Sequence, residues 1–67
     1  MKVKDILDIL ALDEGQRLTV FDYCTGNIYR AKHGTVLDAP LRKIEEINAS
    51  DVVSFSVCDD GIKIWIG

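Results

Sequence analysis

The residues that could carry out catalytic chemistry are few, and they do not form a recognisable set. His33 is the only histidine, and it could serve as a general base or a metal ligand. Cys24 and Cys58 are the only thiols, and no spacing links either of them to the histidine. Asp59 and Asp60 supply two carboxylates, whereas a calcium loop needs several oxygen ligands at fixed spacing. The sequence therefore predicts a protein that is not an enzyme, holds no metal and needs no cofactor.

A second group of residues has the chemistry of a binding surface. Trp65 lies two positions after Lys63, and tryptophan is among the residue types that dominate binding hot spots. Tyr29 and Arg30 form a similar aromatic and basic pair earlier in the chain. We expect these four residues to contact a protein partner, unless a helix or the first hairpin covers the indole within the monomer. Interleaved aromatic and basic residues also stack nucleic-acid bases, but a net charge of −3 argues against nucleic acid.

The closing segment, residues 51–66, predicts the β-hairpin that would present the tryptophan. Asp60-Gly61 is a typical two-residue hairpin loop, and this loop would set Val57 opposite Ile64. One face would then be apolar and the other mostly polar. The apolar face would carry Val53, Phe55, Val57, Ile62, Ile64 and Ile66, and the other face Ser54, Ser56, Cys58, Lys63 and Trp65.

Residues 17–24 and 28–33 predict an earlier hairpin, because both segments are rich in β-branched and aromatic side chains. We favour a three-residue loop with Gly26 in a left-handed conformation, which would pair Phe21 with Tyr29. A two-residue loop is the alternative, since neither face of this hairpin is cleanly apolar.

Residues 3–12 predict an amphipathic helix. Its apolar side chains fall at positions i, i+3, i+4 and i+7, which form one helix face: Val3, Ile6, Leu7 and Leu10. Gly15 marks its end. A helix this short hardly forms alone, so it must pack on the sheet.

A second helix is predicted between residues 38 and 48. Asp38 would be its N-cap, Pro40 would lie in the first turn, and Asn48 would end it in a left-handed conformation. A short edge strand at residues 35–37 would precede it. This order of elements predicts an α+β fold, with the N-terminal helix packed on a small antiparallel sheet or partly open barrel of four or five strands.

Size and composition limit the class of protein. The 67 residues predict a single domain, residues 1–67. The hydrophobic share of 48% is large for so short a chain, and either a dense core or burial between the subunits of a homo-oligomer would explain it. We expect no signal peptide, and no segment approaches the roughly 20 apolar residues of a membrane span. Two unpaired cysteines agree with a cytoplasmic location.

Three parts of the chain carry a resemblance to a known group of proteins. They are residues 1–10 (MKVKDILDIL), residues 19–26 (TVFDYCTG), and the closing strands at 53–57 and 60–64. In these segments the chain resembles short uncharacterised proteins encoded by phages and prophages of Gram-positive bacteria. The resemblance includes no catalytic motif, so it transfers no functional residue. It implies a setting in which small proteins bind and block a host protein or sequester a host signalling molecule.

These observations predict a non-enzymatic interaction protein that binds a protein partner through an exposed sheet face or edge, as a mobile-element inhibitor of a host protein would. The alternative is an oligomeric protein that sequesters a small ligand of the nucleotide type. In that case Arg30, Lys32 or Arg42 would meet a phosphate in pockets between subunits.

Overall fold

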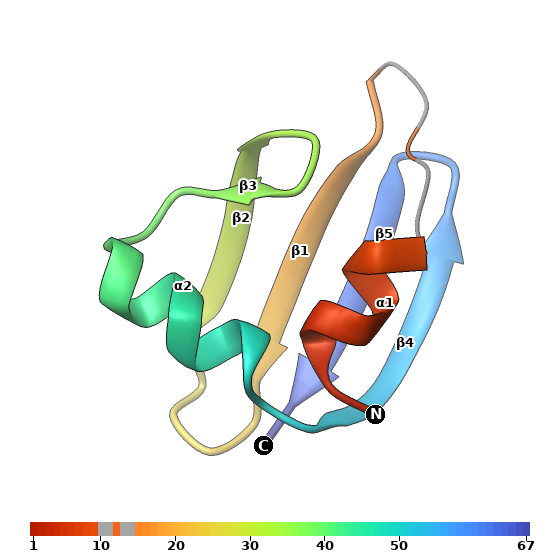
Figure 1. Cartoon of the computed structure of the whole chain (residues 1–67). Coiled ribbons are helices and arrows are strands. Elements are labelled where there is room, and N and C mark those ends of the chain that lie inside the picture. The colour runs from red at the N-terminus through yellow and green to blue at the C-terminus, as the bar shows by residue number, and fades with distance from the viewer. Residues whose placement is uncertain (10–11, 13–14) are drawn as a thin grey trace.

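The protein has two layers, a five-stranded sheet and two helices that both lie over one face of it (Figure 1). The computed structural model describes residues 1–9, 12 and 15–67, apart from the side chain of His33. The elements are α1 (Val3–Ile9), β1 (Arg17–Asp22), β2 (Ile28–His33), β3 (Val36–Leu37), α2 (Leu41–Asn48), β4 (Val52–Cys58) and β5 (Gly61–Ile66). The strand order is β3-β2-β1-β5-β4. The predicted α+β class, the N-terminal helix on a small sheet and the short helix before the C-terminal hairpin are confirmed.

The core lies between the two helices and the sheet. Ten apolar residues are almost fully buried there: Val3, Ile6, Leu18, Val20, Ala31, Leu37, Ile47, Ile62, Ile64 and Ile66. Burying one such large side chain stabilises the fold by about 1.5–3 kcal/mol relative to leaving it in water. Val3 and Ile6 belong to α1, whose seven residues would not stay helical in isolation. Leu10, which the sequence places on the same helix face, lies outside the described residues.

The two central strands of the sheet run parallel to each other. In β1 and β5, Thr19 lies opposite Lys63 and Phe21 lies opposite Trp65. The neighbouring pairs β1–β2, β2–β3 and β4–β5 are antiparallel. The sheet is therefore mixed and open, where the sequence predicts an antiparallel one, because parallel strands need a long connection that local patterns do not reveal.

The C-terminal hairpin turns one residue earlier than predicted. Its loop is Asp59-Asp60, and Cys58 pairs with Gly61, which is the first residue of β5. Gly61 adopts a φ of 141°, and a Cβ atom at this position would lie 2.6 Å from the backbone nitrogen of Arg17. Only glycine fits this position, because any side chain would collide with the backbone of β1. Gly61 therefore belongs to β5 and does not form part of the hairpin loop.

The new register moves the hairpin pairing by two residues, and an even shift leaves each side chain on its original face. Trp65 and Lys63 therefore lie on the side opposite the buried isoleucines, as predicted. The exception is at a bulge near the start of β4, where Val52 packs against the core in place of the predicted Val53.

The first hairpin has a longer loop than predicted. The N–H of Asp22 donates to the carbonyl oxygen of Asn27 at 2.9 Å, which leaves four residues in the loop. The carboxylate of Asp22 accepts the N–H two residues further on, and this local bond favours the longer turn. Phe21 then pairs with Ile28, and the predicted pairing with Tyr29 is wrong. This one-residue difference exchanges the faces of β2, so that Tyr29 lies on the helix-covered face.

The second helix begins and ends differently from the prediction. Pro40 is its N-cap, because its backbone at φ −57° and ψ 147° is not helical and the helix starts directly after it. Asp38 instead forms an ion pair with Lys32 at 3.5 Å. Asn48 is the last residue of the helix, and its conformation is not left-handed. Ala49 follows it with a φ of −86°.

Candidate interaction surface

The face of the sheet that carries neither described helix is called the open face below. Its residues alternate with the core residues along the three inner strands: Arg17, Thr19 and Phe21 of β1, Ile28 and Arg30 of β2, and Lys63 and Trp65 of β5. Residues that lie directly opposite one another on neighbouring strands share a face, so the register alone gathers these side chains. Both helices lie over the other side of the sheet (Figure 1).

An aromatic pair lies on the open face near the C-terminal ends of β1 and β5. The rings of Phe21 and Trp65 are stacked, with centroids 5.1 Å apart and an angle of 14° between their planes. Each ring covers one face of the other, so each offers solvent only its second face and its edge. Both residues are half-buried, and Phe21 of the first hairpin gives the indole of Trp65 part of its cover. Ile28 extends the apolar ridge, with 51% of its surface exposed.

Three cations surround a hollow beside this ridge. Thr19 lies at its centre, with Arg30 opposite on β2 and Lys63 opposite on β5. Arg17 comes two residues before Thr19 on the same strand, and therefore on the same face. The hollow has a volume of about 340 Å³, and Asp60 contributes one carboxylate to its lining.

The three cations around the hollow differ from the paired lysines of the described residues. Elsewhere, Lys2 forms an ion pair with Asp51 at 2.9 Å and Lys43 with Glu46 at 3.3 Å. None of the three cations around the hollow forms an ion pair with a residue that the structure describes. The chain as a whole is acidic, so this cluster is a local positive region that favours an acidic group.

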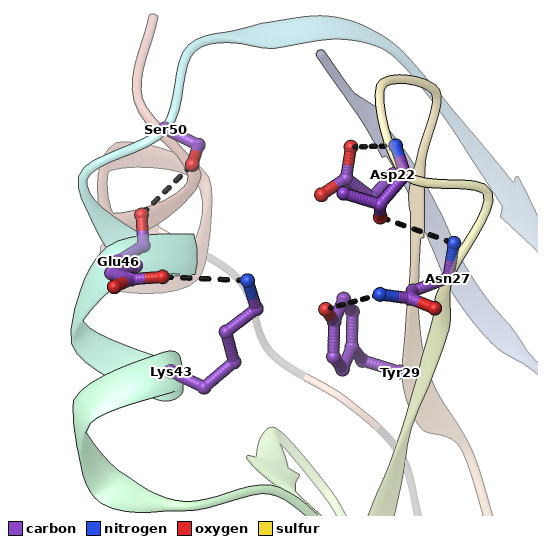
Figure 2. Close-up of polar contacts among 7 residues, drawn as sticks. Asp22, Asn27, Tyr29, Lys43, Glu46 and Ser50 are labelled. Carbon is purple, nitrogen blue, oxygen red and sulfur yellow. Dashed lines mark hydrogen bonds and ion pairs between the residues drawn. The ribbon is translucent and has the colours of Figure 1, made fainter.

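Tyr29 lies on the helix-covered side, where it contacts the second helix (Figure 2). Its hydroxyl oxygen accepts a hydrogen bond from the side-chain amide of Asn27 at 3.3 Å. The ammonium of Lys43 lies 5.7 Å from the centre of the tyrosine ring. The Tyr29 side chain, followed by the Glu46 carboxylate, raises the pKa of Lys43 above its usual value. Tyr29 therefore helps to hold α2 against the sheet.

Three of the four residues predicted to contact a partner come together. Trp65, Lys63 and Arg30 share the open face, and Tyr29 does not. Arg17 and Phe21 also belong to this surface, although they were not among the predicted contact residues. Their alternation along one strand was the available signal, but their position beside β5 depends on the parallel pairing.

The residues considered for catalysis do not converge in the part of the chain that the structure describes. Cys24 is exposed in the loop after β1, and Cys58 is half-buried at the end of β4. Since β1 and β5 are parallel, these two thiols lie at opposite ends of the sheet. The described residues include no group of three His, Cys, Asp or Glu side chains that could hold a metal ion.

In the described ranges, neither helix is both long and apolar enough to cross a membrane. Comparison of the chain with protein-family models, with curated proteins and with solved structures finds no match.

Proposed function

We propose that the protein is a non-enzymatic binding module that docks an acidic segment of a partner protein on its open face. The observation that carries this proposal is the stacked Phe21–Trp65 pair beside three cations that lack counter-ions among the described residues. Binding hot spots combine an aromatic anchor with flanking polar or charged contacts. Trp65 would supply the anchor, and Arg30 and Lys63 would meet carboxylates of the partner.

The proposed setting is the cytoplasm of a bacterial host. Cys24 and Cys58 are both unpaired, which suits a reducing compartment. The resemblance of the chain to phage and prophage proteins favours a host protein as the partner. In that setting the module would act by occupying a surface that the host protein needs.

Affinity capture from a host lysate with four baits tests the proposal. The baits are the wild type, Trp65→Ala, the double variant Arg30→Ala/Lys63→Ala, and the charge-matched control Arg42→Ala/Lys4→Ala in the helix layer. Truncation of a hot-spot residue costs about 2 kcal/mol or more, so we expect the first two variants to retain the partner at least about tenfold less well. The control should retain it like the wild type.

Each bait must first give the amide NMR spectrum of a folded domain. A partner that binds all four baits equally would show that the open face is not the docking surface. Captured material that disappears after nuclease treatment would identify nucleic acid in place of a protein.

A nucleotide-type ligand is the second candidate, because the hollow could hold a phosphate among its cations. The predicted set does not converge: Lys32 is paired with an aspartate, and Arg42 belongs to α2. Arg17 and Lys63 lie near Arg30 instead. A nucleotide at a hundred times its dissociation constant should stabilise the domain by about 2.7 kcal/mol in a thermal-shift assay. A shift that the double variant Arg30→Ala/Lys63→Ala abolishes would favour this candidate, and no shift with any nucleotide would reject it.

A further inference from the structure

The two edges of the sheet differ in how well they are protected. β3 is an edge strand of only two residues, whereas β4 is an edge strand of seven. Soluble proteins usually protect a long edge with charged side chains, proline or a bulge. β4 contains no charged residue and no proline, and its bulge lies at its first residues.

Three of the four exposed residues of β4 are apolar, and the fourth is Ser54. Val53, Phe55 and Val57 are exposed by 57%, 53% and 68% of their surface. Phe55 and Val57 are paired with Ile64 and Ile62, so they lie on the helix side of the sheet but beyond the cover of the helices. Every second residue of an edge strand also turns its N–H and C=O groups away from the sheet.

The part of β4 that follows its contact with the N-terminal segment has a palindromic sequence. The N–H of Val52 donates to the carbonyl oxygen of Met1 at 2.8 Å, so the N-terminal segment already occupies the beginning of the strand. The residues that follow, 53–57, read Val-Ser-Phe-Ser-Val in both directions. In an antiparallel pair of identical strands centred on Phe55, each valine would oppose a valine and each serine a serine.

We propose that a second copy of the chain pairs with β4 in this register, so that two five-stranded sheets form one continuous sheet. Charge does not oppose the contact at its centre, although each copy carries a net charge of −3, because the paired strands are neutral. Asp51, immediately before the strand, forms an ion pair with Lys2 at 2.9 Å. Both copies use the same edge, so the assembly closes as a two-fold dimer.

This surface is separate from the open face, so the dimer and the docking of an acidic partner can fail independently. The first experiment is sedimentation equilibrium over a concentration series. We expect the wild type to approach twice its mass of 7.5 kDa as concentration rises. Phe55→Lys should remain monomeric, because it places two like charges opposite each other at the centre of the pair. Val36→Lys, the same kind of change on the other edge, should dimerise like the wild type.

A cross-linking experiment tests the register without removing the phenylalanine. In a Cys24→Ser/Cys58→Ser background, Ser54→Cys is mixed with Ser56→Cys under mild oxidation. Directly opposite residues have Cα atoms about 4.5–5.5 Å apart, which a disulfide can bridge. We expect a disulfide-linked dimer from the mixture and little from either variant alone, because identical positions are offset along the strands.

Three results would overturn the proposal. The first is a wild type that stays monomeric at every concentration. The edge of β4 would then be open to pairing with a strand of another protein. The second is a dimer that persists in folded Phe55→Lys. The third is cross-linking of Ser54→Cys alone as efficient as that of the mixture.

Discussion

The two faces of this sheet are built from the same strands but perform different tasks. Along β1, Leu18 and Val20 are buried beneath the helices, while Thr19 and Phe21 lie on the open face. The covered face contains the apolar core of the domain, and the open face contains an aromatic pair and three cations that form no ion pair with the residues that the structure describes. Because side chains alternate along a strand, the residues that stabilise the fold differ from those proposed to dock a partner. The two properties should therefore respond to different mutations.

The largest expected effect separates two isoleucines on opposite faces. Ile64→Ala removes a side chain with 0% exposure, and such core truncations cost about 2–5 kcal/mol of unfolding free energy. Ile28→Ala makes the same chemical change on the open face and should cost less than about 1 kcal/mol. Urea denaturation followed by far-ultraviolet circular dichroism measures both. Similar losses for the two variants would mean that the open face contributes to the core.

A smaller effect is expected within the aromatic pair itself. A double-mutant cycle of Phe21→Leu and Trp65→Leu should give a coupling of about 0.5–1.5 kcal/mol, the usual range for stacked rings. Urea denaturation of the four proteins provides the free energies. A cycle of Phe21→Leu with the distant Ile47→Val is the control, and it should be additive. Additivity in the aromatic cycle would indicate that the rings are not stacked in solution.

The smallest effect concerns an exposed ion pair between the N-terminus and β4. The hydrogen bond and then the charge of Lys2 lower the pKa of Asp51 below its ordinary value of 3.8. A lowered pKa in the folded state adds stability that is present above pH 3.8 and is lost as the pH falls through the folded-state value. NMR titration of the Asp51 carboxyl should show its pKa rising in Lys2→Gln and staying low in Lys4→Gln.

Acid unfolding of the wild type, Lys2→Gln and Lys4→Gln tests whether that ion pair contributes to the stability of the folded state. The pair is exposed, and such pairs contribute little to stability. The midpoints of acid unfolding should therefore differ only slightly. A large shift of the unfolding midpoint in Lys2→Gln would mean that this surface ion pair contributes substantially to the stability of the domain.

Features with a local signal could be predicted from the sequence. The apolar spacing of Val3 and Ile6 predicts α1, and alternation predicts the faces of the C-terminal hairpin even though its loop is displaced. Side chains alternate along a strand with a period of two, so an error of two residues in the pairing leaves the predicted face unchanged. For this reason Trp65 and Lys63 are correctly placed on the uncovered side. The hairpin formed by β1 and β2 had two mixed faces, and a one-residue error there moved Tyr29 to the wrong one.

The parts that could not be predicted depend on contacts between distant segments. No local period specifies that β1 runs beside β5, and this pairing alone brings Phe21 to Trp65 and Arg17 close to Lys63. The need for Gly61 in a strand has the same origin, because its constraint is the backbone of β1. The residues that β5 contributes to the candidate surface could therefore be predicted from the sequence, whereas those of β1 could not.

The position of β5 between β1 and β4 has a consequence for how the chain folds during synthesis. This strand is the last element in sequence but an inner strand of the sheet. Until β5 has been synthesised, the first hairpin and β4 have no common neighbour, and the isoleucines that complete the core are missing. Folding must then wait for contacts of high sequence separation, which slows a small domain relative to one built from local contacts. The nascent polypeptide would expose its apolar strands during that interval, when a chaperone could bind them.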